Sequence, residues 1–180
     1  MKIIIFGGSG AGTTTLAASL AEQLGYTHFD VDDFYWVKTQ VPYQIKIARS
    51  QRIDNLKRAL NAVDNAIVSG SLVSWGEYWS SAFDLAVLLR LPQNVRMNRL
   101  KKRELERYGD SLLKDPEMQA KSQEFLEWAR NYDDPLFSGR NIGLHLSWAK
   151  SLSCKHIEIG DLPNDERMEV VLEKIKELVH

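Results

Sequence analysis

Short apolar runs alternate along the chain with longer segments in which apolar residues recur at helical spacing. Apolar runs typical of strands buried on both faces of a sheet lie within residues 2–6, 66–68 and 84–91, and residues 26–29 and 156–159 are predicted as two further strands. The periodic segments predict helices over residues 16–24, 43–63, 95–108, 117–131 and 165–179. This alternation predicts an α/β fold: a doubly wound parallel sheet of about five strands, flanked by helices on both sides.

The composition is that of a single ordinary globular domain. The 180 residues, 44% hydrophobic and 26% charged, suit one domain spanning residues 1–180 with a sizeable core. Lysine and arginine number 23 against 24 acidic residues. A surface that binds nucleic acid would need a marked basic excess, so we expect no nucleic-acid partner. Cys154 is the single cysteine, and the apolar run at residues 2–6 is too short for a signal peptide or membrane span. We therefore expect a cytoplasmic protein with no membrane partner, whose oligomeric state stays open.

A glycine-rich segment joins the first predicted strand to the first predicted helix, and it reads Gly7-Gly8-Ser9-Gly10-Ala11-Gly12-Thr13-Thr14-Thr15. Its spacing matches the phosphate-loop pattern GxxxxGK[ST] at both glycines and at Thr14. Such a loop turns backbone N–H groups toward phosphates, and the following helix terminus adds partial positive charge. The segment therefore predicts binding of the phosphates of ATP, with Thr14 as a ligand of Mg²⁺.

One position departs from that pattern, because Thr13 stands where the loop normally has lysine. The lysine usually bridges the β- and γ-phosphates, so its loss bears on turnover more than on phosphate binding. The absence of the lysine supports an alternative interpretation, in which the chain is a nucleotide-binding regulatory or DNA-associated module that lacks efficient turnover.

Together with other short motifs, the loop resembles the P-loop nucleoside and nucleotide kinase superfamily. Within it, the chain is most similar to a bacterial group of adenylate kinase-like, AAA-family ATPases whose loop reads GxxGxGTTT. The resemblance extends over nearly the whole chain through Ser69-Gly70-Ser71, Trp75-Gly76, and His145 with Trp148 ahead of Cys154. It implies an ATP- and Mg²⁺-dependent kinase for a small-molecule acceptor. It also implies an acceptor-binding segment at about residues 32–64 and a lid at about residues 99–141.

Acidic residues follow the second predicted strand, at the sheet edge where open α/β folds bind ligands. The segment resembles the Asp-x-Asp of shikimate kinase-like proteins at Asp30 and Asp32, and the Asp-Ser-Phe-Tyr of uridine kinase-like proteins from Asp32 onward. Both resemblances imply that Asp32 orients an acceptor hydroxyl or accepts its proton. Asp30 is expected to hold a Mg²⁺-bound water, and Asp33 is expected to be a solvated carboxylate.

Four arginines lie at helical spacing within residues 95–108 and are predicted to share one face: Arg96, Arg99, Arg103 and Arg107. In the resembling superfamily this helix leads into the lid, whose arginines close over the transferring phosphoryl group. Arg99 and Arg103 are therefore predicted to be catalytic, and so is Arg140 on the far side of the lid. Arg96 and Arg107 are expected on a solvated face.

These observations favour an ATP-dependent small-molecule kinase with an unknown acceptor. A second kinase interpretation stays open, in which the acceptor is a nucleoside monophosphate. Its phosphate would then be held by arginines, and Asp32 would be incidental. The sequence does not distinguish the two acceptors.

Overall fold

The five predicted strands form one parallel sheet in the order β2-β3-β1-β4-β5, which confirms the predicted fold class. The structure, a computed structural model, describes residues 1–179. The strands are β1 (Lys2–Gly7), β2 (Thr27–Asp30), β3 (Ala66–Ser69), β4 (Leu85–Leu89) and β5 (Lys155–Ile159). Each lies within two residues of its predicted limits. The central strands β1, β3 and β4 are continuous apolar runs and are buried, whereas the edge strands β2 and β5 are partly exposed.

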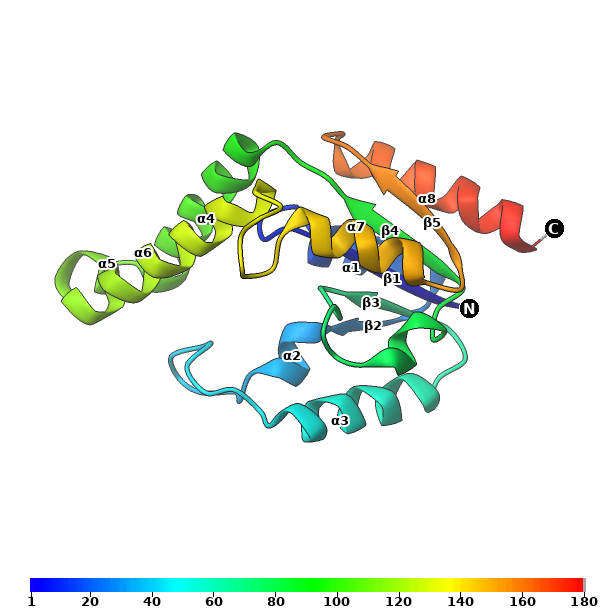
Figure 1. Cartoon of the computed structure of the whole chain (residues 1–180), viewed down its shortest axis with the longest axis horizontal. Coiled ribbons are helices and arrows are strands. Elements are labelled where there is room, and N and C mark those ends of the chain that lie inside the picture. Colours follow the sequence, from blue (N-terminus) through cyan, green and yellow to red (C-terminus); the bar gives the residue numbers. More distant parts are fainter. Residues whose placement is uncertain (180) are drawn as a thin grey trace.

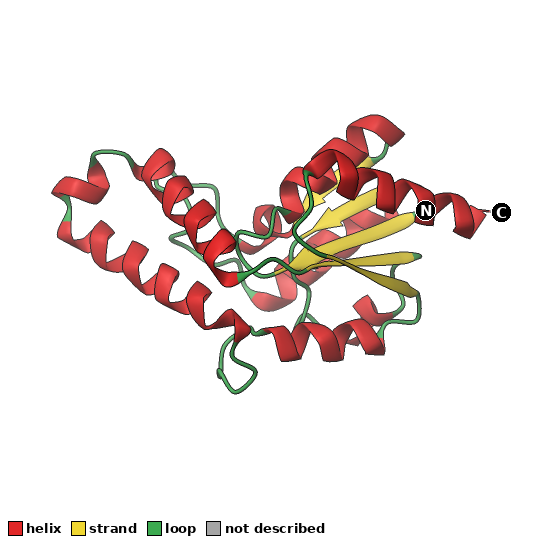
Figure 2. Ribbon diagram, turned by 90° about the horizontal axis from the view of Figure 1, so that it is seen from above, coloured by secondary structure: helices red, strands yellow, loops and turns green. Residues whose placement is uncertain are grey.

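Helices cover both faces of the sheet (Figures 1 and 2). The main helices are α1 (Thr13–Leu24), α3 (Arg49–Asn61), α4 (Gln93–Tyr108), α6 (Pro116–Arg130), α7 (Ile142–Ser151) and α8 (Asn164–Val179). Alternate residues of β1 enter opposite cores. Ile3 and Ile5 pack with residues of α1 and α8, whereas Ile4 and Phe6 pack with residues of α3 and α7. The result is a three-layer α/β/α domain.

The predicted helix over residues 43–63 is wrong at its start, since α3 begins only at Arg49. The preceding residues form a loop whose two arms meet at an antiparallel bridge between Trp36 and Lys46. The Val37 N–H donates to the carbonyl of Ile45 at 2.8 Å, and Tyr43 at the loop tip has a left-handed φ of 64°. These cross-loop bonds hold the backbone in a non-helical conformation.

Short elements complete the chain: α2 (Val31–Tyr35), η1 (Glu77–Ser80), α5 (Ser111–Lys114) and η2 (Asn131–Asp133). The sequence interpretation missed these and α7. Helices α4, α5 and α6 extend away from the sheet as one arm (Figure 1), within the segment predicted to be the lid. In the described part of the chain, no helix is both long and apolar enough to cross a membrane.

Candidate active site

The predicted site lies at the carboxyl edge of the sheet, where three neighbouring strands end. Gly7 ends β1, Asp30 ends β2 and Ser69 ends β3. Ser69 is in register with Asp30 on one side and with Ile5 of β1 on the other. Parallel pairing therefore brings the start of the glycine-rich loop and the acidic segment to the same edge, as the sequence predicts.

The glycine-rich loop has the backbone that a phosphate cradle requires. Gly10 and Gly12 have φ values of 84° and 91°, and Gly12 is the N-cap of α1. A Cβ on Gly10 would lie 2.7 Å from the carbonyl oxygen of Arg96, so this position excludes any side chain. The loop and the first turn of α1 thus bring the nine predicted phosphate-binding residues, 7–15, into one continuous turn.

Thr14 and Asp30, the two residues predicted to serve the metal, are in direct contact. The Thr14 hydroxyl donates to Oδ2 of Asp30 at 2.8 Å. The other oxygen of Asp30 accepts the backbone N–H of Asp32 at 2.9 Å and caps α2. Hydroxyl and carboxylate oxygens are ligands that Mg²⁺ prefers, so these two residues fit a magnesium ion held partly through water.

Asp32 lies in the first turn of α2, directly after this cap. Solvent reaches its side chain, yet the surrounding protein removes enough water to raise the pKa of the carboxyl. The charge of Asp30 raises the pKa further, whereas the charges of Arg140 and Arg103 lower it. Asp33 is exposed as well, and it pairs with Lys38 at 3.2 Å. The two neighbouring carboxylates thus differ in the charges around them, and their roles stay predictions.

Arg103 of α4 and Arg140, just before α7, come from separate segments and both act on Asp32. Burial lowers the pKa of each guanidinium, and the charge of Asp32 raises it. Within residues 1–179, neither arginine has a carboxylate within 4 Å or a side-chain hydrogen bond. Their guanidinium groups lie 5.9 Å from the ring centre of Phe125 and 5.6 Å from that of Trp128. The charges of these two arginines thus act on Asp32 although no ion pair within 4 Å joins them to it.

The other arginines of α4 lie elsewhere. Arg99 is beside the loop, with a guanidinium nitrogen 3.6 Å from where a Cβ on Gly12 would be, and 3.9 Å from Asp161. The structure does not bring it to Asp32, and its catalytic role stays a prediction. Arg107 covers the ring of Tyr43 at 4.4 Å. The expectation that Arg96 is solvated is wrong, because its side chain is fully buried.

Sequence reasoning missed several residues that touch the loop. Arg167 of α8 is buried and donates to the carbonyl of Ala11, and the ring of Tyr132 lies 2.7 Å from where a Cβ on Gly8 would be. Both come from segments more than 100 residues away from the loop in sequence. No local pattern marks such residues, because their contacts exist only after α6, η2 and α8 have packed.

A buried hydrogen-bond chain links Tyr132 to the end of β3. The Tyr132 hydroxyl and Nδ1 of His145 are 2.7 Å apart, and Nε2 of His145 and the Ser71 hydroxyl are 2.9 Å apart. Burial and the charge of Arg140 lower the pKa of His145 to about 3. The imidazole is therefore neutral at physiological pH, and each ring nitrogen has a hydroxyl partner.

Acidification is expected to destabilise the fold through His145. Its folded pKa of about 3 lies below its ordinary value of 6.5, so the unfolded chain binds more protons between these pH values. The free energy of unfolding should therefore fall by about 2 kcal/mol between pH 7 and pH 5, as urea titrations at both pH values would measure. A His145→Gln variant should lose this part of the pH dependence. An equal pH dependence in both proteins would contradict the assignment.

Three comparisons relate the chain to known proteins. Residues 3–123 match the family described as an AAA domain. A protein of Bacillus subtilis (strain 168), the uncharacterized protein YqaC, is 37% identical in an alignment of 178 positions that covers 96% of each chain. Shikimate kinase from Bacteroides thetaiotaomicron superposes with a TM-score of 0.57 at 17% identity, covering 99% of this chain and 98% of the other.

Deoxyadenosine kinase from M. mycoides, solved with bound dCTP, superposes with a TM-score of 0.51 at 18% identity. The superposition covers 98% of this chain and all of that one. Identities this low establish the shared fold and leave the substrate of this chain open. The family match covers more than half of the chain, and the Bacillus subtilis relative is similar along nearly its whole length. The chain therefore belongs to the AAA domain family and has the fold of the P-loop kinases.

Proposed function

We propose that this protein is an ATP-dependent kinase that moves the γ-phosphate of ATP to a small-molecule acceptor. One observation carries the proposal: Arg103 and Arg140 are near enough to Asp32 for their charges to lower the pKa of its carboxyl, yet neither has a carboxylate within 4 Å in the described chain. Protein atoms remove part of the water around both guanidinium groups, although Arg103 stays solvent-exposed, and an anion would stabilise the two charges there. A transferring phosphoryl group is an anion of suitable geometry at this place, next to the phosphate loop.

The loop at residues 7–15 would bind the phosphates of ATP through its backbone N–H groups and the start of α1. Thr14 and Asp30 would hold Mg²⁺, in contact at 2.8 Å. When bound, the ion neutralises charge on the phosphate oxygens. Because Thr13 replaces the loop lysine, the arginines beside Asp32 are the groups that would balance charge on the γ-phosphate.

Asp32 would act on the acceptor. An acceptor hydroxyl oxygen forms a bond to the γ-phosphorus while the bond from that phosphorus to the β-phosphate oxygen breaks, which leaves ADP. The hydroxyl proton passes to the Asp32 carboxylate, whose raised pKa suits a general base better than an ordinary aspartate would. Arg103 and Arg140 stabilise the charge on the three equatorial oxygens during transfer.

Residues 32–64 would bind the acceptor, and residues 99–141 would close over it. Two contacts already join these segments: Arg107 donates to the Tyr43 hydroxyl at 3.4 Å, and Lys121 donates to the side-chain oxygen of Gln44 at 3.0 Å. The arm of α4, α5 and α6 therefore reaches the tip of the loop that the bridge between Trp36 and Lys46 closes. Closure of this arm would exclude water from the reacting groups.

Thr13 supports a second candidate, a nucleotide-binding module without efficient turnover. A monophosphate kinase is a variant of the first candidate, in which Arg103 and Arg140 bind the phosphate of the acceptor. The three differ in what they consume and bind. The module binds ATP without consuming it, and the two kinases differ in whether the acceptor supplies a hydroxyl or a phosphate.

Formation of ADP from Mg·ATP should depend on one class of acceptor. We expect this in a coupled assay of the purified chain against a panel of nucleosides, nucleoside monophosphates and hydroxylated metabolites. Calorimetry should show ATP binding without any acceptor. Binding without turnover on any acceptor would favour the regulatory module, and no ATP binding at millimolar concentration would refute both candidates.

Gly10→Ala serves as the loop control in the same assays, because its Cβ would lie 2.7 Å from the Arg96 carbonyl oxygen. Gly25→Ala is the matched control. Gly25 also has a positive φ, 66°, but a Cβ there meets nothing within 4 Å. Both substitutions place an alanine at a positive φ. Only Gly10→Ala also forces a side chain against backbone within the phosphate loop, so only this variant should abolish ATP binding.

A further inference from the structure

Two buried arginines approach the glycine-rich loop from different helices. Arg96 of α4 is fully buried, and its Nη1 donates to the carbonyl of Ser9 at 3.2 Å. Arg167 of α8 is 3% exposed, and its Nη1 donates to the carbonyl of Ala11 at 3.1 Å. The two guanidinium groups thus bind alternate peptides of the same loop. Neither contact belongs to the chemistry proposed above.

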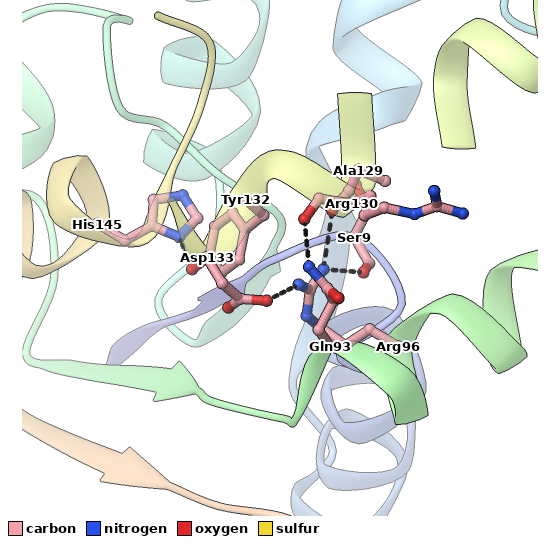
Figure 3. A network of polar contacts seen from close by, with 8 residues as sticks. All are labelled: Ser9, Gln93, Arg96, Ala129, Arg130, Tyr132, Asp133 and His145. Carbon is pink, nitrogen blue, oxygen red and sulfur yellow. Dashed lines mark hydrogen bonds and ion pairs between the residues drawn. The ribbon is translucent and has the colours of Figure 1, made fainter. Parts of the chain in front are cut away.

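Each arginine is held in place by several further contacts. Arg96 donates to the carbonyl of Ala129 at 3.2 Å, pairs with Asp133 and lies 4.8 Å from the ring centre of Tyr132 (Figure 3). In the same network, Gln93 donates to the carbonyl of Arg130 at 2.8 Å, which ties α4 to the end of α6. Burial of such charged groups requires partners, and here loop carbonyls are among them.

Arg167 is fixed in the same manner on the other side of the loop. Its Nη2 lies 3.5 Å from a carboxylate oxygen of Asp161, which Arg99 approaches at 3.9 Å. Its Nη1 lies 3.5 Å from where a Cβ on Gly12 would be. The guanidinium group therefore lies against the last turn of the loop, directly before α1.

Because the peptide bond is planar, a contact to a loop carbonyl also fixes the direction of the N–H group in the same peptide. No peptide bond among residues 1–179 is cis, and in a planar trans peptide the C=O and the N–H point to opposite sides. A guanidinium on the Ser9 carbonyl therefore directs the N–H of Gly10 away from Arg96. A guanidinium on the Ala11 carbonyl directs the N–H of Gly12 away from Arg167.

We propose that Arg96 and Arg167 are positioning residues of the phosphate cradle, which hold the N–H groups of Gly10 and Gly12 toward the bound phosphates. This inference rests on the proposed phosphate-binding role of the loop. A charged donor on a carbonyl also polarises the peptide and strengthens its N–H as a donor. Moreover, the loop is surrounded by three arginines that pair with only two carboxylates: Arg96 with Asp133, and Arg99 and Arg167 with Asp161. These side chains leave one net positive charge beside the loop, where the usual lysine would supply one and Thr13 does not.

The test measures nucleotide affinity by calorimetry in the full chain, for wild type, Arg167→Met and Arg167→Lys. Arg167→Met should weaken the binding of Mg·ATP and Mg·ADP by about tenfold or more, because it removes a charge-assisted hydrogen bond to the cradle. Arg167→Lys keeps one cationic donor and should recover most of the affinity. Adenosine, which has no phosphate, should bind all three proteins equally, and a general structural defect would not produce that selectivity.

Lys174→Met is the control on the same helix as Arg167, because Lys174 pairs with Glu177, also in α8. It should bind ATP as wild type does. The same series at Arg96 gives a second test, and if Arg96→Met does not fold, the Arg167 series decides. A second readout needs no nucleotide. The amide resonance of Gly12 should shift in Arg167→Met and return toward its wild-type position in Arg167→Lys.

Failure of the positioning role and failure of the proposed function give different results. If wild type binds ATP and a folded Arg167→Met binds it equally well, the positioning role is wrong and the proposed function stands. Equal weakening of ATP and adenosine would also overturn the positioning role, since it would indicate a structural effect. If wild type itself does not bind ATP, the proposed function fails, and this inference fails with it.

Discussion

Asp32→Asn is expected to lower kcat by about 10²–10⁴, the usual contribution of a general base, while ATP affinity stays nearly unchanged. The substitution keeps the size of the side chain and removes its charge and basicity. Asp32 follows the Asp30 cap, the charges of Arg103 and Arg140 act on it, and in the proposed function it takes the proton of the acceptor. Steady-state kinetics with the identified acceptor, together with calorimetry of ATP binding, would measure both effects.

Asp33→Asn is the matched control for this prediction. Asp33 is the adjacent residue in α2, and it pairs with Lys38 at 3.2 Å. Its replacement should change kcat by less than about fivefold, as expected of a surface ion pair of about 0–1 kcal/mol. If the kcat of Asp32→Asn were close to that of wild type, the acceptor would not be a hydroxyl that needs a base. The monophosphate-kinase interpretation would then stand.

Arg140→Met and Arg103→Met are each expected to reduce kcat by about 10²–10³, as is typical when one donor to a developing charge is removed. Both guanidinium groups lack a carboxylate within 4 Å in the described chain, and both act on Asp32. Their full effect should appear only when charge develops on the phosphoryl group, so ATP affinity should fall far less than turnover. Single-turnover rates and calorimetric affinities would separate the two.

Arg107→Met is the control on the same helix. The Arg107 guanidinium covers Tyr43 at 4.4 Å and pairs with Glu104 at 3.7 Å, so it has partners of its own. Arg107→Met should lower kcat far less than Arg103→Met, because Arg107 would assist closure of the arm and would not balance charge on the phosphoryl group. Equal and small effects at Arg103, Arg107 and Arg140 would show that none of them contacts the phosphoryl group. A higher acceptor KM with an unchanged kcat would instead indicate that Arg103 and Arg140 bind an acceptor phosphate.

Local sequence was sufficient to predict the sheet and the phosphate loop. A continuous apolar run at Ile3–Phe6 can be buried only inside a sheet covered on both faces, and the glycines that follow it supply the positive φ angles of the loop. Both signals involve residues adjacent in the chain. The pairing of Thr14 with Asp30 was also within reach, because parallel strands bring their carboxyl ends to one edge.

The start of α3 was not predictable from the same patterns. Residues 43–48 continue the helical spacing, but the structure places them in a loop closed by the bridge between Trp36 and Lys46. Hydrogen bonds across the loop replace those of a helix, and the tip meets α4 and α6 through Tyr43 and Gln44. Tertiary contacts of this kind override a weak helical preference.

By itself, the sequence determined the α/β class, the strands and the position of the phosphate loop, because these depend on hydrophobic period and on glycine spacing within short segments. Only the tertiary structure decided where the arginines of α4 lie. Arg96, Arg99 and Arg103 have similar sequence surroundings, yet Arg96 is buried against the loop, Arg99 lies beside Gly12, and the charge of Arg103 acts on Asp32. Burial of a guanidinium depends on carbonyls and carboxylates from distant segments, here α6, η2 and the loop itself, and no local pattern encodes them.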